Sequence, residues 1–304
     1  MTTTFDLLTL WYDMVYKMIQ YPQMNMQTCY LCQHPTHQLL KAKNRAIIRC
    51  DNCKLTYTPD SASSDGHIRE DSGKFVKEYL DEARRYKQYF DTIIGIIQKH
   101  KKPQSLLDVG CGVGIFLQQV KINGWKAIGV DMSADSVAYA RARGLAVRRG
   151  KIEELTFRPG SFDVITLFQT IEHIKDPIKT LEKLYLLLRR GGILVLTTPN
   201  EESVLAKAQG KFWFGYRNIE HLYFFNEQSL TVLQKKVGFK RISIHTENGR
   251  VLSAPWVLTR LFDYYYNQAS ILTSLMRKTR PYWKYLNWIT FREPRVNLVS
   301  VAVK

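Results

Sequence analysis

The sequence has no long apolar run and no internal repeat, and it contains relatively few acidic residues. Its apolar stretches are all shorter than the roughly 20 residues that a membrane-spanning helix requires. The N-terminal residues lack a basic segment, a continuous apolar core and a small-residue cleavage site, so we expect no secretory signal. Residues 5–19 instead place apolar side chains at helical spacing, which predicts an amphipathic helix within residues 1–24.

Acidic residues are outnumbered, because 44 Lys and Arg stand against 27 Asp and Glu and give a formal net charge of +17. Such a charge favours nucleic acid, anionic lipid surfaces or phosphorylated substrates, but it does not indicate a fold. The sequence contains no RNP-type motif, homeodomain pattern or long basic arm, which are the usual marks of nucleic-acid binding. The charge therefore selects no single partner.

The sequence has only five cysteines, and four of them form the pairs Cys29–Cys32 and Cys50–Cys53. Each Cys-x-x-Cys turn offers two thiolates to one ion, and a hairpin between the turns would complete a tetrahedral site. The spacing predicts a structural zinc ribbon over residues 25–60, with disulfides or metal-free thiols as alternatives. Four thiolates close the coordination shell, so this zinc would stabilise the fold without taking part in catalysis. Thiolate ligation also favours a reducing compartment, and we expect a cytoplasmic protein.

Residues 61–102 are expected to form a polar linker followed by a covering helix. The linker is rich in turn-forming residues. From Phe75 to His100, aromatic and aliphatic side chains recur on one helical stripe, which predicts a helix that faces the core and could break near Gly95.

The most informative run is Ser105 to Gly114, followed by an apolar segment that ends in Asp131. The apolar residues up to Asp108 predict a buried strand, and the alternating glycines after it allow a sharp turn close to a ligand. A helical pattern begins at Ile115 and leads to a second buried strand. Strand, glycine turn, helix, strand and acid form the nucleoside-binding half of a doubly wound α/β fold, with the acid placed for ribose hydroxyls.

The spacing of the glycines distinguishes two nucleoside cofactors. A dinucleotide fingerprint requires a third glycine where Ile115 stands. The observed Asp-x-Gly-x-Gly-x-Gly run instead resembles motif I of the class I S-adenosylmethionine-dependent methyltransferases. A tight turn without a ligand also accounts for the glycines, but it does not account for the motifs that follow.

Later motifs agree with this resemblance and appear in the family's order. Residues 162–169 resemble motif IV, and residues 172–177 match the Glu-His-x-x-Asp-Pro signature of enzymes similar to the ubiquinone-biosynthesis O-methyltransferases. Asp176 is expected to cap the next helix, which would end at residues 189–192 with two arginines and two glycines. The resemblance covers residues 103–247 and a closing strand at 296–303. It implies a Rossmann-like, doubly wound sheet of seven strands within a domain at residues 103–304.

The resemblance implies that S-adenosylmethionine is the cofactor and that it lies against the glycine loop and the neighbouring strand ends. The residues expected to hold it are Asp108, Gly110, Cys111, Gly112, Gly114, Asp131, Met132, Ile152, Glu153 and Gln169. The family usually places an acidic residue near the adenine amino group, where this chain has Lys151. Ile152 would then pack on the adenine ring and Glu153 would be the nearest acid, unless Glu153 is a solvated charge at a helix start.

Methyl transfer is an in-line displacement at a sulfonium, so most of its catalysis is alignment of the acceptor with the methyl group. A hydroxyl acceptor also needs a base within hydrogen-bond reach. His173 is the first candidate and His221 the second, with a packing role as the alternative for each. Some relatives bind a divalent ion through a Glu-x-x-Glu-His cluster, but Gln169 replaces the first carboxylate here, so we expect no catalytic magnesium.

The sequence leaves the acceptor open. We expect methylation, most simply of oxygen, on a small-molecule, sugar or lipid-linked acceptor. The alternative is a nucleic-acid-binding or RNA- or protein-modifying zinc-ribbon protein on the same fold. Residues 248–294 form an aromatic and basic insertion, interpreted as a lid over the pocket, a peripheral contact with the anionic inner face of a membrane, or a dimer interface.

Overall fold

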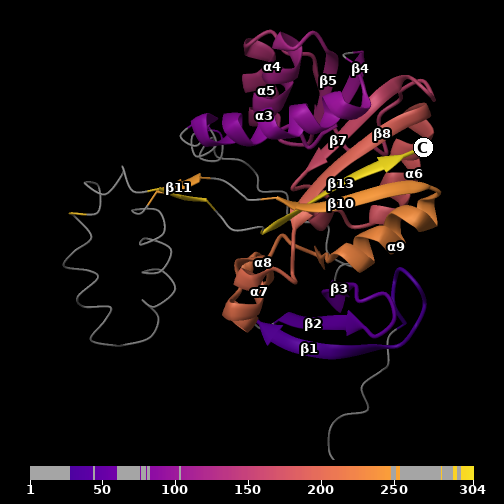
Figure 1. Cartoon of the computed structure of the whole chain (residues 1–304), viewed down its shortest axis with the longest axis vertical. Coiled ribbons are helices and arrows are strands. Elements are labelled where there is room, and N and C mark those ends of the chain that lie inside the picture. The colour runs from indigo at the N-terminus through magenta and orange to yellow at the C-terminus, as the bar shows by residue number, and fades with distance from the viewer. Residues whose placement is uncertain are drawn as a thin grey trace, which may run out of the picture.

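The computed structural model describes residues 28–43, 45–59, 76, 80, 83–102, 104–247, 251–253, 282, 290–292 and 296–304. In this part of the chain, a seven-stranded sheet covered by helices lies beside a small four-stranded sheet (Figure 1). The predicted doubly wound α/β fold is therefore confirmed. The expected helix in residues 1–24, most of the linker and most of the 248–294 insertion lie outside the described residues.

The large sheet has the spatial order β10-β13-β8-β7-β4-β5-β6. Its strands are β4 (Ser105–Val109), β5 (Lys126–Asp131), β6 (Val147–Arg149), β7 (Phe162–Phe168), β8 (Leu188–Pro199), β10 (Arg241–Glu247) and β13 (Asn297–Val303). Strands β4 to β8 run parallel to one another, and β13 pairs antiparallel with both β8 and β10. The strand order reverses between β4 and β7, and in such sheets ligands bind at the carboxyl ends of the strands beside this reversal.

The central strands are buried on both faces, as parallel strands between two helical layers must be. Leu107 and Ile165 belong to the core formed with α6 (Pro177–Leu187) and α9 (Glu227–Val237). The residues that precede them, Leu106 and Val164, belong to the core on the opposite face of the sheet, with α3 (Ala83–His100) and α4 (Ile115–Ile122). This alternation with a period of two residues anchors the register of the sheet.

Several helices begin with side-chain caps, and the predicted cap at Asp176 is among them. The Ser133 side chain accepts a hydrogen bond from the Ser136 amide at the start of α5 (Ala134–Ala142). Asp176 accepts from the Lys179 amide at α6, and Asn226 begins α9 with a capping box. Helix α3 continues through Gly95 without a break.

The predicted end of α6 is wrong. The helix ends at Leu187, and Arg189 and Arg190 lie in β8. Leu188 already pairs with Phe162 of β7, and Arg189 Nη1 lies 2.8 Å from Asp163 Oδ2. The arginine therefore pairs with a carboxylate of the neighbouring strand and does not interact with the C-terminus of the helix.

The N-terminal module (residues 28–59, called the ribbon below) contains β1 (Thr36–Ala42), β2 (Arg45–Cys50) and β3 (Thr56–Tyr57). Its sheet is completed by β9 (Tyr223–Phe224), which pairs antiparallel with β3. Figure 1 shows the ribbon beneath α7 (Val204–Gln209), α8 (Phe214–Arg217) and α9. The ribbon is thus joined to the large domain through backbone hydrogen bonds.

Four shorter elements complete the described structure. The 3-10 helices η2 (Ile171–His173) and η3 (Gly210–Phe212) follow β7 and α7. Strands β11 (Val251–Ser253) and β12 (Thr290–Arg292) pair antiparallel near the two ends of the 248–294 insertion. Among the described residues, no helix combines the length and apolar character needed to cross a bilayer.

Candidate active site and metal centre

The four ribbon cysteines converge as predicted. Their sulfur atoms lie within 4.8 Å of one another, with 3.6 Å between Cys29 and Cys53 and 3.4 Å between Cys32 and Cys50. Four thiolates around a tetrahedral zinc, with Zn–S bonds of about 2.3 Å, would be about 3.8 Å apart. The donor set and its spacing therefore fit zinc.

The surroundings of the cysteines also favour metal binding. All four are free, and their sulfur separations far exceed the about 2.05 Å of a disulfide, so the disulfide alternative does not hold. The Leu31 amide donates to Cys29 Sγ, and the Asn52 side chain donates to Cys32 Sγ. Hydrogen bonds donated to a sulfur stabilise its negative charge, so these two contacts favour the thiolates that bind metal.

The glycine loop connects β4 to α4 at the predicted cofactor edge. Gly110 has a φ of +75°, and a Cβ there would lie 2.3 Å from the Thr170 hydroxyl oxygen. Gly114 begins α4 in the left-handed region with a φ of +81°. Both positions favour glycine, because a side chain would be strained at each φ, and a Cβ at Gly114 would also lie 2.5 Å from Leu145 Cδ1.

Asp131 ends β5 and lies directly beside this loop. Its carboxylate accepts from the Gly112 amide at 2.7 Å and from the Ser133 amide at 2.9 Å. These two bonds hold the half-buried carboxylate at the carboxyl edge of the sheet, next to the loop. An acid at this place is the group that receives ribose hydroxyls in doubly wound folds.

Asp108 and Cys111 lie beneath the loop surface. Asp108 is 2% exposed and accepts from the Thr166 hydroxyl at 2.7 Å. Burial raises the pKa of its carboxyl to about 7. Cys111 is buried beside Leu117 and Val137, and burial raises the pKa of its thiol above the usual range, so the thiol is not activated as a nucleophile.

The remaining expected cofactor residues lie on the loops that follow β5, β6 and β7. The Met132 carbonyl accepts a hydrogen bond from the Arg149 side chain. Ile152 is buried in the core that the sheet forms with α6 and α9. The half-buried Glu153 accepts a hydrogen bond from the Thr180 hydroxyl of α6. Its carboxylate is already engaged with the protein.

Gln169 follows β7 in a conformation that is rare for a side-chain-bearing residue. Its φ is +48°, its amide donates to the Thr197 carbonyl at 2.9 Å, and its side chain donates to the Thr197 hydroxyl at 3.4 Å. Such backbone strain, which costs about 1–3 kcal/mol, tends to occur at functional sites. Gln169 therefore lies at the carboxyl edge, as its predicted place near the methyl group requires.

His173 and His221 come together although they are far apart in the sequence. Their rings pack edge to face with centroids 4.7 Å apart. His173 Nδ1 lies 3.0 Å from the Glu220 carbonyl oxygen. Because a carbonyl only accepts, Nδ1 carries the hydrogen and Nε2 of neutral His173 carries the lone pair. Burial, with the nearby His173, lowers the pKa of His221 to about 3, so His221 is neutral near pH 7.

Glu172 joins the two histidines and is absent from the predicted site. It is 1% exposed, and burial raises the pKa of its carboxyl. One carboxylate oxygen accepts from the Thr198 hydroxyl at 3.0 Å, while the other has no hydrogen-bond partner in the described part of the chain. Glu172, His173 and His221 each place one donor atom within 4.8 Å of the others, so this cluster could relay a proton or bind a cation.

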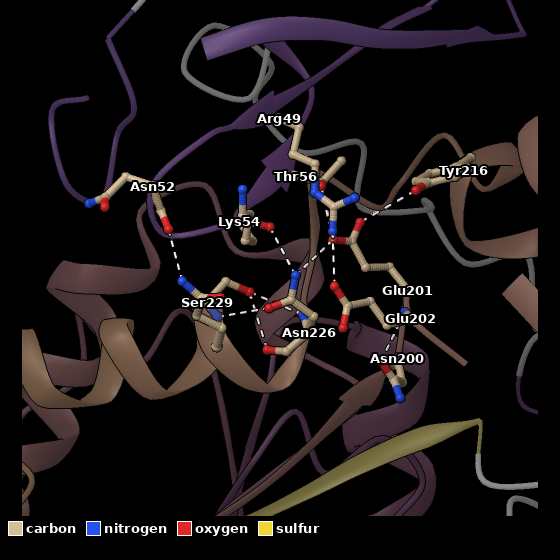
Figure 2. Close-up of polar contacts among 11 residues, drawn as sticks. Arg49, Asn52, Lys54, Thr56, Asn200, Glu201, Glu202, Tyr216, Asn226 and Ser229 are labelled. Atoms are coloured by element: carbon tan, nitrogen blue, oxygen red, sulfur yellow. Dashed lines mark hydrogen bonds and ion pairs between the residues drawn. The ribbon is translucent and has the colours of Figure 1, made fainter. Parts of the chain in front are cut away.

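A second polar network joins the ribbon to the large domain, and sequence reasoning missed it (Figure 2). Glu201 accepts from Arg49 at 3.2 Å, Thr56 at 2.9 Å and Asn226 at 3.0 Å. Arg49 also contacts the exposed Glu202. Burial raises the pKa of the Glu201 carboxyl to about 7. The Glu-Glu pair that follows β8 was the available signal, but its ribbon partners are 145 and 152 residues away from Glu201.

Comparison with known proteins places these features in a family. A family model described as a methyltransferase domain matches residues 80–244, which is more than half of the chain. The chain belongs to this methyltransferase family. The resemblance deduced from the motifs is thereby confirmed, and the nucleic-acid-binding alternative gains no support from the match.

Curated relatives share the central part of the chain. A ubiquinone biosynthesis O-methyltransferase of Bordetella bronchiseptica is 34% identical over 102 residues, which are 31% of this chain and 42% of that protein. Another from Pseudomonas paraeruginosa is 35% identical over 104 residues, covering 32% and 45%. The match thus spans less than half the length of these relatives.

Solved structures agree in fold. A methyltransferase of Thermotoga maritima, titled a possible histamine N-methyltransferase, has a TM-score of 0.52 at 22% identity and covers 78% of this chain and 99% of its own. A methyltransferase of Archaeoglobus fulgidus has a TM-score of 0.51 at 19% identity, covering 75% and 99%. These likenesses concern the fold alone.

Proposed function

We propose that this chain transfers a methyl group from S-adenosylmethionine to a hydroxyl of a small-molecule, sugar or lipid-linked acceptor. The proposal rests on the contact between the glycine loop and the turn at residues 170–173, which carries His173. Gly110 packs against Thr170, and the Thr170 carbonyl accepts from the His173 amide at 3.0 Å. The cofactor loop and the candidate base are therefore adjacent at one edge of the sheet.

The chain's own residues account for binding and alignment. Asp131 and the amides of the glycine loop would hold the nucleoside, and Gln169 would lie near the reacting centre. When bound, S-adenosylmethionine supplies an electrophilic methyl group on a sulfonium. The acceptor must then approach in line with that methyl group, and fixing this geometry is the main catalytic task of the protein.

His173 is the better candidate for the base. The Glu220 carbonyl accepts the hydrogen of its Nδ1, so Nε2 can take the hydroxyl proton as the carbon–oxygen bond forms. His221, whose pKa is lowered to about 3, is too weak a base to remove a proton from a hydroxyl. We assign His221 a supporting role, in which its ring packs against His173.

We also propose that zinc binds the four ribbon cysteines and that the protein works in the reducing cytoplasm. The support is the set of four thiol ligands at near-tetrahedral spacing. The ion would stabilise the ribbon, since four thiolates leave no position for a substrate. Metal analysis of the protein purified without chelator tests this assignment.

A lipid-linked acceptor is favoured by one feature of the described surface. The segment between β8 and β9 carries exposed apolar side chains with basic residues among them: Val204, Phe212, Phe214 and Ile219, with Lys207, Lys211 and Arg217. Apolar side chains beside cations suit the interface of an anionic membrane. Cosedimentation with anionic vesicles at low salt, weakened by added salt, is expected; lack of binding would favour a water-soluble acceptor.

The reaction itself is tested by product release. The whole zinc-loaded chain is incubated with S-adenosylmethionine and a panel of hydroxylated small molecules and lipid-linked sugars, and S-adenosylhomocysteine is measured. Release that depends on one class of acceptor is expected. Binding of S-adenosylmethionine with no release on any oxygen, nitrogen or carbon acceptor would contradict the proposed enzyme.

A further inference from the structure

The loop that carries His221 is held by a side chain of the ribbon. Arg45, the first residue of β2, donates from Nη1 to the Asn218 carbonyl at 3.3 Å and to the Ile219 carbonyl at 2.6 Å. Its Nη2 donates to the His221 carbonyl at 2.8 Å. A planar guanidinium presents its donors in a fixed fork, so this one side chain holds three carbonyls in place. These carbonyls belong to residues 218–222, which are called the histidine loop below.

The histidine loop in turn orients the candidate base. The Glu220 carbonyl, which lies between the carbonyls held by Arg45, accepts from His173 Nδ1 at 3.0 Å. The Leu222 amide donates to the Glu172 carbonyl at 2.8 Å, which ties the loop to the residue before His173. A shift of the loop would therefore move the hydrogen-bond partner of His173.

A second set of ribbon contacts offers a control. Arg49, also on β2, binds Glu201 and Glu202, which lie outside the histidine loop, so it holds the ribbon on the large domain at a different place (Figure 2). Loosening the ribbon at Arg49 and loosening it at Arg45 should therefore have different consequences for His173.

We propose that Arg45 is a positioning residue for methyl transfer: it fixes the histidine loop so that the Glu220 carbonyl holds His173 with the hydrogen on Nδ1 and the lone pair on Nε2. This inference rests on the proposed role of His173 as the base. It gives the ribbon a part in the reaction, since a side chain of β2 determines which nitrogen of the base faces the acceptor.

The test compares Arg45→Ala, Arg45→Lys and Arg49→Ala in the zinc-loaded whole chain. Nitrogen NMR of ¹⁵N-labelled histidines reports the tautomer of His173. The His173 signals are identified by their disappearance in His173→Ala. The wild type and Arg49→Ala should show hydrogen on Nδ1, whereas Arg45→Ala should show a mixture of tautomers. Lysine is a single-point donor that cannot reach three carbonyls, so Arg45→Lys should restore the Nδ1 tautomer only in part.

Turnover and binding complete the test, with the acceptor that gives the fastest release of S-adenosylhomocysteine. Arg45→Ala should lower kcat by about 100-fold, as expected for a misplaced catalytic group, and leave the Kd for S-adenosylmethionine unchanged. Arg49→Ala should lower stability but keep kcat within about threefold of the wild type.

Two results would overturn the inference. One is an unchanged tautomer and kcat in Arg45→Ala or, where that variant does not fold, in Arg45→Lys. The other is an equal loss in Arg49→Ala, which would mean that any loosening of the ribbon has this effect. A normal kcat in His173→Ala would instead refute the proposed base, and the tautomer comparison would still decide whether Arg45 fixes the loop.

Discussion

The two sides of the site are built in different ways. On the cofactor side, Asp131 bonds to Gly112 and Ser133, which are 19 and 2 residues away. On the acceptor side, His173 bonds to Glu220 across 47 residues, and Arg45 bonds to His221 across 176. The surroundings of Asp131 are thus the product of one strand–helix–strand unit, whereas the surroundings of His173 combine distant segments of the large domain with a loop that the ribbon contacts.

This difference has a functional consequence. Changes in the ribbon that release the histidine loop should impair methyl transfer more than cofactor binding, because Asp131 bonds to Gly112 and Ser133 within the large domain. Changes at the glycine loop should instead weaken cofactor binding more than they lower kcat. The predictions below use this contrast, and they run from the largest expected effect to the smallest.

The largest effect is expected from Cys50→Ser. Structural zinc contributes about 10–16 kcal/mol of apparent binding free energy in small domains, so removing one of four ligands should release the metal and unfold the ribbon. Metal analysis and thermal unfolding measure these losses. The large domain should still bind S-adenosylmethionine, and a variant that keeps one zinc per chain would contradict the assignment.

His173→Ala should lower kcat by about 100-fold or more, the usual contribution of a general base. The Kd for S-adenosylmethionine should stay near the wild-type value, because His173 bonds to the histidine loop and not to Asp131. Turnover and calorimetry on the same preparation separate the two quantities. Equal losses of cofactor binding and activity would indicate that His173 only holds the fold together.

Glu201→Gln should change how stability depends on pH. Burial raises the pKa of Glu201 to about 7 from an ordinary 4.5, so the folded state favours the protonated carboxyl. Its contribution is complete below pH 4.5 and is lost as the pH rises through about 7. Glutamine does not ionise, so relative to wild type the variant should gain up to about 3 kcal/mol between these limits.

Urea unfolding at pH 4.5 and pH 8 measures this difference. A control is Glu202→Gln, which removes the exposed neighbour and should change the pH dependence little, since exposed ion pairs contribute about 0–1 kcal/mol. Parallel pH curves for the wild type and Glu201→Gln would show that folding does not change the pKa of Glu201, which would contradict the prediction.

The smallest effect is expected at the cap of α5. Ser133→Ala removes the side-chain acceptor for the Ser136 amide and should lower stability by about 1 kcal/mol. The Ser133 amide that donates to Asp131 is retained, so cofactor binding should change less than threefold. Denaturant unfolding and calorimetry provide the two values, and a large loss of affinity would mean that the cap itself shapes the cofactor site.

The local features of the cofactor side were predictable from the sequence. The strand before Asp108, the glycine turn and the Ser133 cap depend on residues that are neighbours in the chain, where backbone conformation and capping chemistry act. The paired cysteine turns were predictable for the same reason. Their spacing already implies a shared ion.

The failures have a common physical cause, which is contact between distant segments. The α6 helix was expected to end with arginines in its last turn, but strand pairing at Leu188 and the ion pair of Arg189 with Asp163 place them in β8. The roles of Glu172, Glu201 and Arg45 depend on which segments dock together. No local pattern around these residues indicates their partners.

Binding of S-adenosylmethionine to the whole zinc-loaded chain, measured by calorimetry beside Asp131→Ala, tests the central claim most directly. The wild type should bind one equivalent, and the variant should bind at least about tenfold more weakly, because a charged hydrogen bond is worth about 1.5–3 kcal/mol. The variant should keep its zinc and its unfolding profile. No binding by the wild type, or equal affinity in both proteins, would contradict the assignment of this edge as the cofactor site.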